Sequence, residues 1–184
     1  IVAIASQYNS TIQLILRNTA EVQMKNPVCT IVTPTIPTTI NYLIKTFEDG
    51  NLLSGDWVNI NAIATINWAI KTSTNPSNPG KVVECNNYIS SGNQPACETW
   101  FISPSVDLSA ANSPKLSFLS SCIFSGPPPQ ALVSIDYTIG DPTVATWAVL
   151  PAVFGTSSTY VSSGNISLSY YKKKGLKIAF KYTG

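Results

Sequence analysis

Apolar and polar residues alternate with a period of two along several short segments of this chain. In one such segment, Val133, Ile135 and Tyr137 share a face that excludes Ser134 and Asp136. Further segments of this kind cover residues 12–16, 116–124 and 176–182. Because successive side chains of a strand point to opposite faces, the alternation predicts strands, most of them with one wetter face.

Turn-forming residues separate the predicted strands, and helical periodicity is almost absent. The turn signals are Asp49-Gly50, Asn78-Pro79-Gly80, Ser91-Gly92-Asn93, Gly126-Pro127-Pro128-Pro129 and Gly140-Asp141-Pro142. Gly tolerates a left-handed backbone, Asp and Asn bond their own backbone, and Pro fixes φ for a turn. Many short strands with such punctuation predict an all-β fold, either a sandwich or a barrel.

A stretch rich in proline and threonine divides the chain. It covers residues 25–40 and includes Pro34 and Pro37. Because proline cannot donate to a β-ladder, we predict an extended linker there. Residues 1–24 bury too little surface to form a core alone, so we interpret them as the C-terminal β fragment of a preceding domain, or as strands that the main domain borrows. Residues 41–184 then form the main β domain.

The chain contains no histidine, and this narrows the function classes open to it. Ser-His-Asp and Cys-His nucleophiles, His-based zinc sites and the usual general base near neutral pH are all removed. Only nine acidic residues remain for carboxylate chemistry. The net charge is +2 and the basic run is limited to Lys172–Lys174, so nucleic-acid binding has little support. We predict a protein that is not an enzyme and binds no nucleic acid.

The sequence does not decide whether the four cysteines form disulfides. They are Cys29, Cys85, Cys97 and Cys122, and four cysteines allow three pairings. Cys85 and Cys97 flank a loop rich in Gly, Pro and Asn, which makes them the most plausible pair. Buried or free thiols fit the sequence equally well. No pair has the C-x-x-C spacing of zinc or redox sites.

Four blocks of residues follow one another from position 46 onward and span about three quarters of the chain. The first is Thr46–Gly50 with Gly55-Asp56-Trp57, and the second is Glu98–Pro104 with Val106–Ser109. The third is Pro114–Phe118, and the fourth joins Val133–Tyr137, Gly140–Pro142, Ala145–Trp147 and Lys177–Gly184. In this arrangement the chain resembles the choice-of-anchor J group of bacterial surface domains, which is related to the cleaved-adhesin domains of surface proteases.

The resemblance implies a jelly-roll-type β-sandwich over residues 41–184, secreted or lipid-anchored in a multidomain protein of a Gram-negative bacterium. It implies an extracytoplasmic place, at the outer membrane or in the periplasm, with membrane contact only through a lipid anchor outside this chain. Residues 1–24 resemble the end of the OB-like domain that often precedes such modules. Such domains usually continue past Tyr182-Thr183-Gly184, so we expect the last strand to be missing here.

Domains of this group are similar to carbohydrate-binding and adhesin modules, in which exposed aromatic rings stack on sugar faces. We expect the tryptophans to pack in the core rather than to bind sugar; they are Trp57, Trp68, Trp100 and Trp147. Tyr88, Phe124 and Tyr160 lie near predicted loops, so we predict that they bind ligand. Asn86 and Asn87 would supply hydrogen bonds from the same region.

Some domains of this group bind structural calcium, which prefers hard oxygen ligands. Glu48 and Asp49 follow an apolar strand and precede a Gly turn, and Asp136 is a further candidate ligand. The alternative is a plain Asp-Gly turn beside a solvated Glu. A glycosidase pair formed by Glu48 and Asp49, or by Glu84 and Glu98, is disfavoured because nothing in the sequence brackets a cleft.

Charged residues make up only 11 % of the chain, a share that suits many extracellular β proteins. The sequence therefore predicts a non-catalytic, extracytoplasmic binding or adhesion module that recognises a glycan or another surface protein. The alternative is a structural spacer of a multidomain surface lipoprotein with no ligand of its own. Exposed aromatic side chains beside polar loops would favour binding, and an all-polar surface would favour the spacer.

Overall fold

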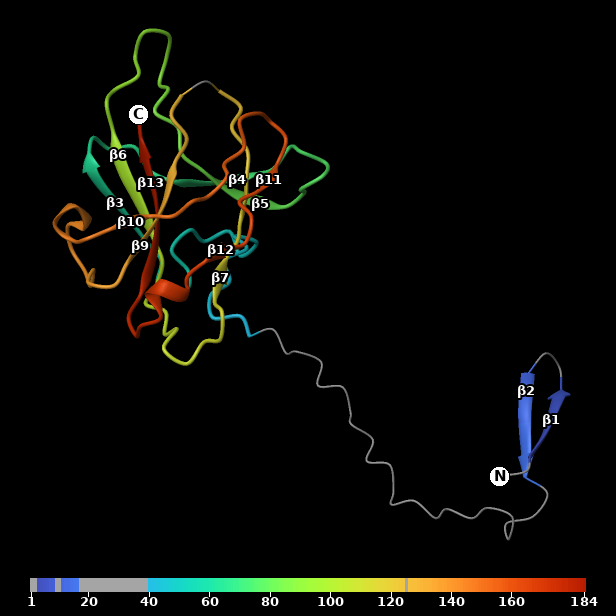
Figure 1. Cartoon of the computed structure of the whole chain (residues 1–184). Coiled ribbons are helices and arrows are strands. Elements are labelled where there is room, and N and C mark those ends of the chain that lie inside the picture. The colour runs from blue at the N-terminus through green and yellow to red at the C-terminus, as the bar shows by residue number, and fades with distance from the viewer. Residues whose placement is uncertain (1–2, 9–10, 17–39, 125) are drawn as a thin grey trace. The chain divides into compact units, whose positions relative to one another are not determined.

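The computed structural model of this chain describes residues 3–8, 11–16, 40–124 and 126–184. The chain divides into two compact units, Ile1–Ile40 and Asn41–Gly184 (Figure 1). In the first unit, strand β1 (Ala3–Tyr8) pairs with β2 (Thr11–Leu16) as an antiparallel hairpin. Residues 25–39, most of the predicted linker, lie outside the described residues.

A five-stranded antiparallel sheet forms the centre of the second unit. Its strands in spatial order are β10 (Ala148–Val149), β9 (Gln130–Ser134), β13 (Lys177–Thr183), β6 (Glu98–Ile102) and β3 (Val58–Ile63). Strand β13 pairs with β9 through Lys177–Lys181 and with β6 through Ala179–Thr183, so it is the central strand of the sheet.

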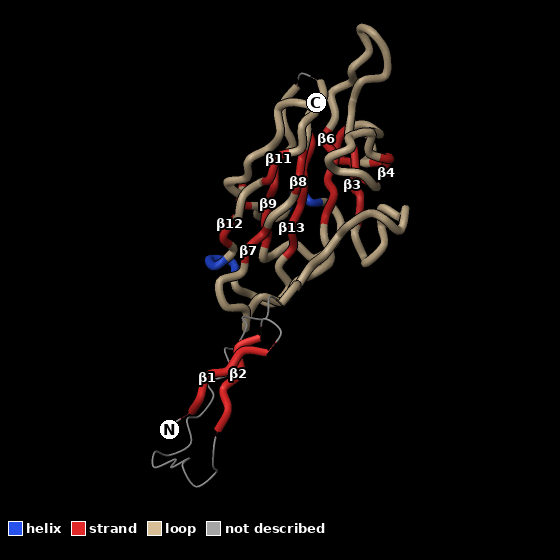
Figure 2. Tube along the Cα trace, turned by 90° about the vertical axis from the view of Figure 1, so that its right-hand side faces the viewer, coloured by secondary structure: helices blue, strands red, loops and turns tan. Residues whose placement is uncertain are grey.

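Three two-stranded ladders form a second layer over one face of this sheet (Figure 2). They are β4 (Ala69–Thr72) with β5 (Lys81–Glu84), β7 (Lys115–Leu116) with β12 (Ile166–Ser167), and β8 (Leu119–Ser120) with β11 (Val161–Ser162). We call the face that they cover the inner face; Phe101 and Phe180 are register partners on it. Val83 of β5 packs against the buried cluster that contains Phe101, and Leu116 of β7 packs against the cluster that contains Ile178.

The opposite face of the sheet, which we call the outer face, is also covered. It carries the buried side chains of Trp100, Ile102, Leu132 and Ala179. The connection from β9 to β10 lies over it and contains the 3-10 helix η2 (Pro142–Val144). A second 3-10 helix, η3 (Ser169–Tyr171), precedes β13, and the described residues contain no α-helix. The predicted all-β, sandwich-like fold is therefore confirmed.

The strand pattern differs from the prediction in two places. Strand β9 ends at Ser134, because the Ser134 hydroxyl accepts hydrogen bonds from the backbone N–H groups of Asp136 (3.2 Å) and Tyr137 (3.0 Å) and so closes a turn. The predicted strand over residues 116–124 is instead split into the short strands β7 and β8. Among the described residues, no helix is long and apolar enough to span a bilayer.

Candidate functional site

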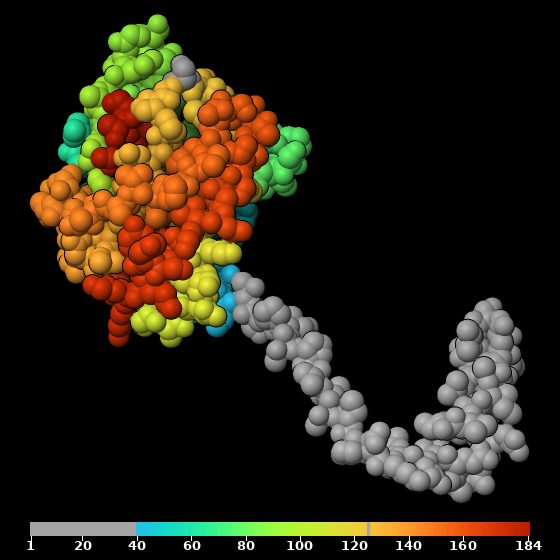
Figure 3. Space-filling model, viewed as in Figure 1, coloured from blue at the N-terminus to red at the C-terminus, as the bar shows by residue number. Residues whose placement is uncertain are grey.

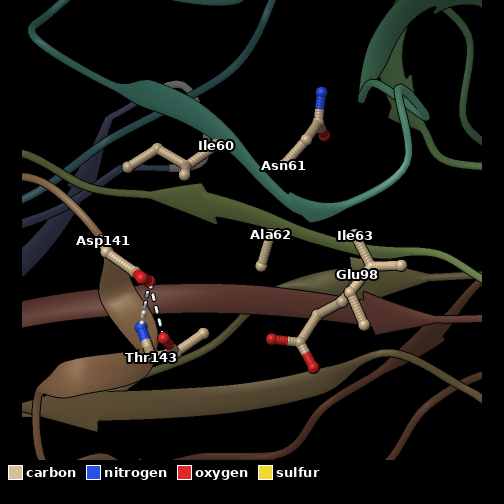
Figure 4. A pocket seen from close by; sticks show the side chains of 7 residues that line it. All are labelled: Ile60, Asn61, Ala62, Ile63, Glu98, Asp141 and Thr143. Carbon is tan, nitrogen blue, oxygen red and sulfur yellow. Dashed lines mark hydrogen bonds between the residues drawn. The ribbon is translucent and has the colours of Figure 1, made fainter.

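The outer face holds a shallow hollow of about 390 Å³, which we call the outer hollow (Figure 4). It is lined by Ile60, Asn61, Ala62, Ile63, Glu98, Asp141 and Thr143. The register of β3 against β6 shifts between Asn61 and Ile63, so Ala62 is the extra residue of a bulge. Figure 4 shows that the Asn61 amide points away from the other lining side chains. The hollow thus lies at a bulged sheet edge, a place where side chains are often redirected.

Glu98 is fixed on the floor of the outer hollow by two hydrogen bonds. Its Oε1 accepts from the indole Nε1 of Trp100 at 2.9 Å, and its Oε2 accepts from Lys181 Nζ at 3.1 Å. The side chains of Lys181 and Glu98 are only 22 % and 17 % exposed, so their ion pair is partly shielded from water. Lys181 Nζ also lies 5.0 Å from the centre of the Trp100 ring. Glu98 therefore presents a carboxylate of fixed orientation.

Asp141 supplies a second carboxylate from the connection between β9 and β10. Its Oδ1 accepts from the backbone N–H of Thr143 at 2.8 Å and from the Thr143 hydroxyl at 2.7 Å. The hydrogen bonds from the Thr143 hydroxyl and backbone lower the pKa of Asp141 below its ordinary value. No described residue donates a hydrogen bond to Oδ2, which leaves this oxygen open to a ligand.

Three aromatic rings hold this connection against the sheet. The Trp147 ring centre lies 5.3 Å from that of Trp100 and 5.3 Å from that of Tyr137. Trp147 Nε1 donates to the carbonyl of Pro142 at 2.8 Å, and the Tyr137 hydroxyl donates to the carbonyl of Gly140 at 2.9 Å. These contacts place Asp141 and Thr143 beside β3.

The outer hollow combines hydrogen-bond acceptors with apolar surface. Asp141 has a lowered pKa, and Glu98 is ion-paired with Lys181. The hollow offers carboxylate oxygens as acceptors next to apolar surface from Ile60 and Ile63, of which Ile63 is 53 % exposed.

The predicted ligand residues lie outside the outer hollow. Asn86, Asn87 and Tyr88 belong to the connection from β5 to β6, which protrudes from one end of the unit near the C-terminus (Figures 1 and 3). Asn86 Oδ1 accepts from the Tyr88 backbone N–H at 2.9 Å. Tyr88 and Phe124 are 55 % and 72 % exposed, whereas Tyr160 is partly buried.

Asn87 is occupied by contacts within the protein. Its Oδ1 accepts from the Tyr182 hydroxyl at 3.1 Å, and its Nδ2 donates to the Pro95 carbonyl at 3.3 Å. The predicted core positions of the tryptophans are confirmed for Trp57 and Trp68, which are buried. Trp100 is buried as well, and Trp147 is partly buried.

The three predicted calcium ligands are not brought together. Glu48 Oε1 accepts from the Lys81 backbone N–H at 2.9 Å. Asp136 Oδ1 accepts from the Ser134 hydroxyl at 2.7 Å and from the Thr146 backbone N–H at 3.1 Å. Among the described residues, which include all three candidates, no group of three His, Cys, Asp or Glu side chains could hold a metal ion. Asp136 therefore does not complete a site with Glu48 and Asp49.

A lysine lies next to Asp49. Lys45 Nζ donates to the carbonyls of Asn51 (2.9 Å) and Ser54 (3.0 Å) and to the Ser54 hydroxyl (2.7 Å). Asp49 accepts from the same Ser54 hydroxyl and from the Asn51 backbone N–H at 3.0 Å. The hydrogen bond from Ser54 is the largest cause that lowers the pKa of Asp49, and the Lys45 charge contributes. An ammonium group thus already contacts the oxygens of this loop.

Sequence reasoning missed the outer hollow, although it noted two of its residues for other reasons. Asp141 stood in a turn signal, and Glu98 stood in a disfavoured carboxylate pair. The Asp-Pro-Thr order does indicate a capped 3-10 turn. Nothing local indicates that Glu98 meets Lys181, which follows it by 83 residues.

Comparison with known proteins identifies no relative. The chain matches no protein-family model, no curated protein and no solved structure. The resemblance to choice-of-anchor J domains, and that of the first residues to an OB-like domain, therefore stay hypotheses.

Proposed function

We propose that this chain is a non-catalytic binding module that recognises a glycan in the outer hollow. The observation that carries the proposal is the pair of carboxylates, Glu98 and Asp141, that line one open hollow together with apolar Ile60 and Ile63. Sugars present hydroxyl donors along their edges and C–H groups on their faces. Charge-assisted hydrogen bonds to fixed carboxylates are stronger than neutral ones, and they give direction as well as energy.

The charge of the outer hollow limits the glycan class that it would accept. Of the seven residues that line it, two are acidic and none is basic. The nearby Lys181 is already paired with Glu98. The carboxylates would therefore repel acidic sugars, and this repulsion would make the site selective against them. Neutral glycans and amino sugars are the classes that fit.

The proposal also includes the setting of the module. Low charge content supports an extracytoplasmic place, secreted or at the cell surface. Membrane contact would come only from a lipid anchor outside this chain. The absence of histidine supports a role without catalysis.

A glycan array of neutral, amino and acidic glycans, probed with the whole chain, tests the proposal. We expect hits among neutral or amino glycans, and we expect Asp141→Asn to weaken binding to them by about tenfold or more in calorimetry, the usual worth of a charged hydrogen bond. Asp107→Asn is the matched control. Asp107 accepts hydrogen bonds from the backbone N–H (3.0 Å) and the hydroxyl (2.6 Å) of Ser109, just as Asp141 accepts from Thr143. Asp107 does not line the outer hollow.

Two results would contradict the proposal. Binding that Asp141→Asn and Glu98→Gln leave unchanged would move the site elsewhere, with Tyr88 and Phe124 as the next positions to substitute. A blank array with folded protein would favour the spacer function.

Calcium at Glu48 and Asp49 is a subsidiary proposal, supported by their adjacent carboxylates. If calcium binds there, added calcium raises the melting temperature of the whole chain and a chelator lowers it. Asp49→Asn should abolish the difference. Equal melting temperatures in calcium and in chelator would remove calcium from the proposal.

A further inference from the structure

Three cysteines surround the last residues of the central strand β13. Cys97 directly precedes β6 and pairs with Gly184, the backbone N–H of each donating to the carbonyl of the other at 3.0 and 3.1 Å. Cys85 directly follows β5 and packs in one core cluster with Tyr182. Burial raises the pKa of the Tyr182 phenol, and the neighbouring thiols of Cys97, Cys85 and Cys122 raise it further.

The side chains of Cys97 and Cys85 both point into the space between the two layers, one from each layer. Alternate residues of β6 share a face. Thr99 and Phe101 are the register partners of Tyr182 and Phe180 on the inner face. Cys97 continues this series, so its side chain points to the inner face. The hairpin of β4 and β5 covers that face through Val83, and Cys85 lies two residues after Val83, on the same side of the hairpin. Cys85 therefore points toward the sheet from the opposite layer.

We propose that Cys85 and Cys97 form a disulfide that ties the hairpin of β4 and β5 to the five-stranded sheet. Oxidised glutathione suffices as the oxidant. One protein thiolate attacks its disulfide, forms a mixed disulfide and releases one glutathione thiolate. The second protein thiolate then attacks the protein sulfur of the mixed disulfide and releases the other glutathione. Two protein thiols lose two protons and two electrons, and one oxidised glutathione becomes two reduced ones.

The surroundings of the two thiols indicate when this bond forms. Cys97 is 1 % exposed. Burial raises the pKa of the Cys85 thiol to about 12, and the nearby Cys97 adds to the shift. Because the thiolate is the attacking species, Cys85 reacts slowly once the chain has folded in its reduced form, and burial keeps oxidants away from Cys97. The disulfide should therefore form during folding in an oxidising medium.

The bond would also close the protruding connection that carries Asn86, Asn87 and Tyr88. Residues 86–96 lie between the two cysteines, so a disulfide at their base limits how far the loop can open. A small closed loop of this kind stabilises mainly by restricting the unfolded chain. The effect is independent of whether the outer hollow binds glycan.

Mass spectrometry of the whole chain, refolded with reduced and oxidised glutathione, tests the pairing. A protease that cleaves after glutamate cuts at Glu84 and Glu98 and releases residues 85–98 as one peptide. We expect this peptide to lack two hydrogens and to resist alkylation until it is reduced. Chymotrypsin cleaves after Tyr88, so it should then give two peptides joined by the disulfide.

Thermal melts give an independent measurement. Reduction should lower the melting temperature of the wild type by roughly 5–10 °C. The effect of reduction should persist in Cys122→Ser and vanish in Cys85→Ser. Because a serine at buried Cys97 risks misfolding, Cys97→Ala serves for that position. Free thiols at both positions after oxidative refolding, or a disulfide from either one to Cys122 or Cys29, would overturn the proposal.

Discussion

Four aspartates in this protein hold their charge through short-range hydrogen bonds. They are Asp49, Asp107, Asp136 and Asp141. In each, a hydrogen bond from a nearby serine or threonine hydroxyl is the largest cause that lowers the pKa below the ordinary value of 3.8. Hydroxyl-to-carboxylate hydrogen bonds of this kind therefore form a motif that recurs across the second unit and, at Asp141, in a candidate site. The motif itself does not mark a binding residue.

These aspartates and the absence of histidine predict the pH dependence of stability. A carboxylate whose pKa is lower in the folded chain adds stability above its unfolded pKa, and this stability is lost as the pH falls through the folded value. With no histidine, no side chain of ordinary pKa changes charge between about pH 5 and 8. We expect melting temperatures measured by circular dichroism to be constant over that range and to fall below about pH 4.

A matched variant sharpens this expectation. Asp136→Asn keeps the shape of the side chain but cannot titrate, so its melting temperature should fall less steeply in acid than that of the wild type. A step in wild-type stability between pH 6 and 7 would contradict the prediction, since no side chain is available to cause it.

At the scale of elements, the central strand β13 should carry much of the stability of the sandwich. Ile178 is 2 % exposed and belongs to the same buried cluster as Val133 and Leu176. Ile178→Ala should reduce the free energy of unfolding by about 2–5 kcal/mol, because it leaves a cavity in a core that cannot fully collapse. Val149 of the edge strand β10 is 61 % exposed, so Val149→Ala should cost less than about 1 kcal/mol.

Urea unfolding of both variants measures the difference. A similar loss for the two substitutions would show that the sheet centre is no better packed than its edge. If Ile178→Ala fails to fold, the two positions can still be ranked by stability, provided that Val149→Ala folds normally.

The strands could be predicted from sequence because alternation is a local property. The pattern at residues 176–182 predicted the strand β13, and its apolar residues Ile178 and Phe180 lie on the inner face. The length of β9 could not be predicted, since its end depends on the Ser134 hydroxyl capturing two backbone donors. The alternation continues through Tyr137, but the strand does not.

The candidate site could not be predicted because it depends on contacts between distant segments. Glu98 joins the outer hollow only because β3 pairs with β6, and Asp141 joins it only because Trp147 packs on Trp100. Neither contact can be recognised from the pattern of residues next to it in the sequence. Sequence reasoning favoured loop aromatics instead, and Tyr88 and Phe124 are indeed exposed, but apart from the outer hollow.

For the whole molecule, the second unit contains a core of its own. Its three clusters of buried side chains, as far as the described residues show them, consist of residues between Leu43 and Tyr182. They fill both faces of the five-stranded sheet, which is the requirement for an independent domain. The β1–β2 hairpin is a two-stranded unit, and such hairpins are at best marginally stable alone.

We therefore predict that residues 41–184 fold without the first 40. Expressed alone under oxidising conditions, they should unfold in one cooperative transition with a melting temperature within about 2 °C of the whole chain, since all core side chains among the described residues are kept. Scanning calorimetry of both chains at matched redox state measures this. If the shorter chain melts much lower or aggregates, the first residues contribute strands to the sandwich, and the domain boundary lies before residue 40.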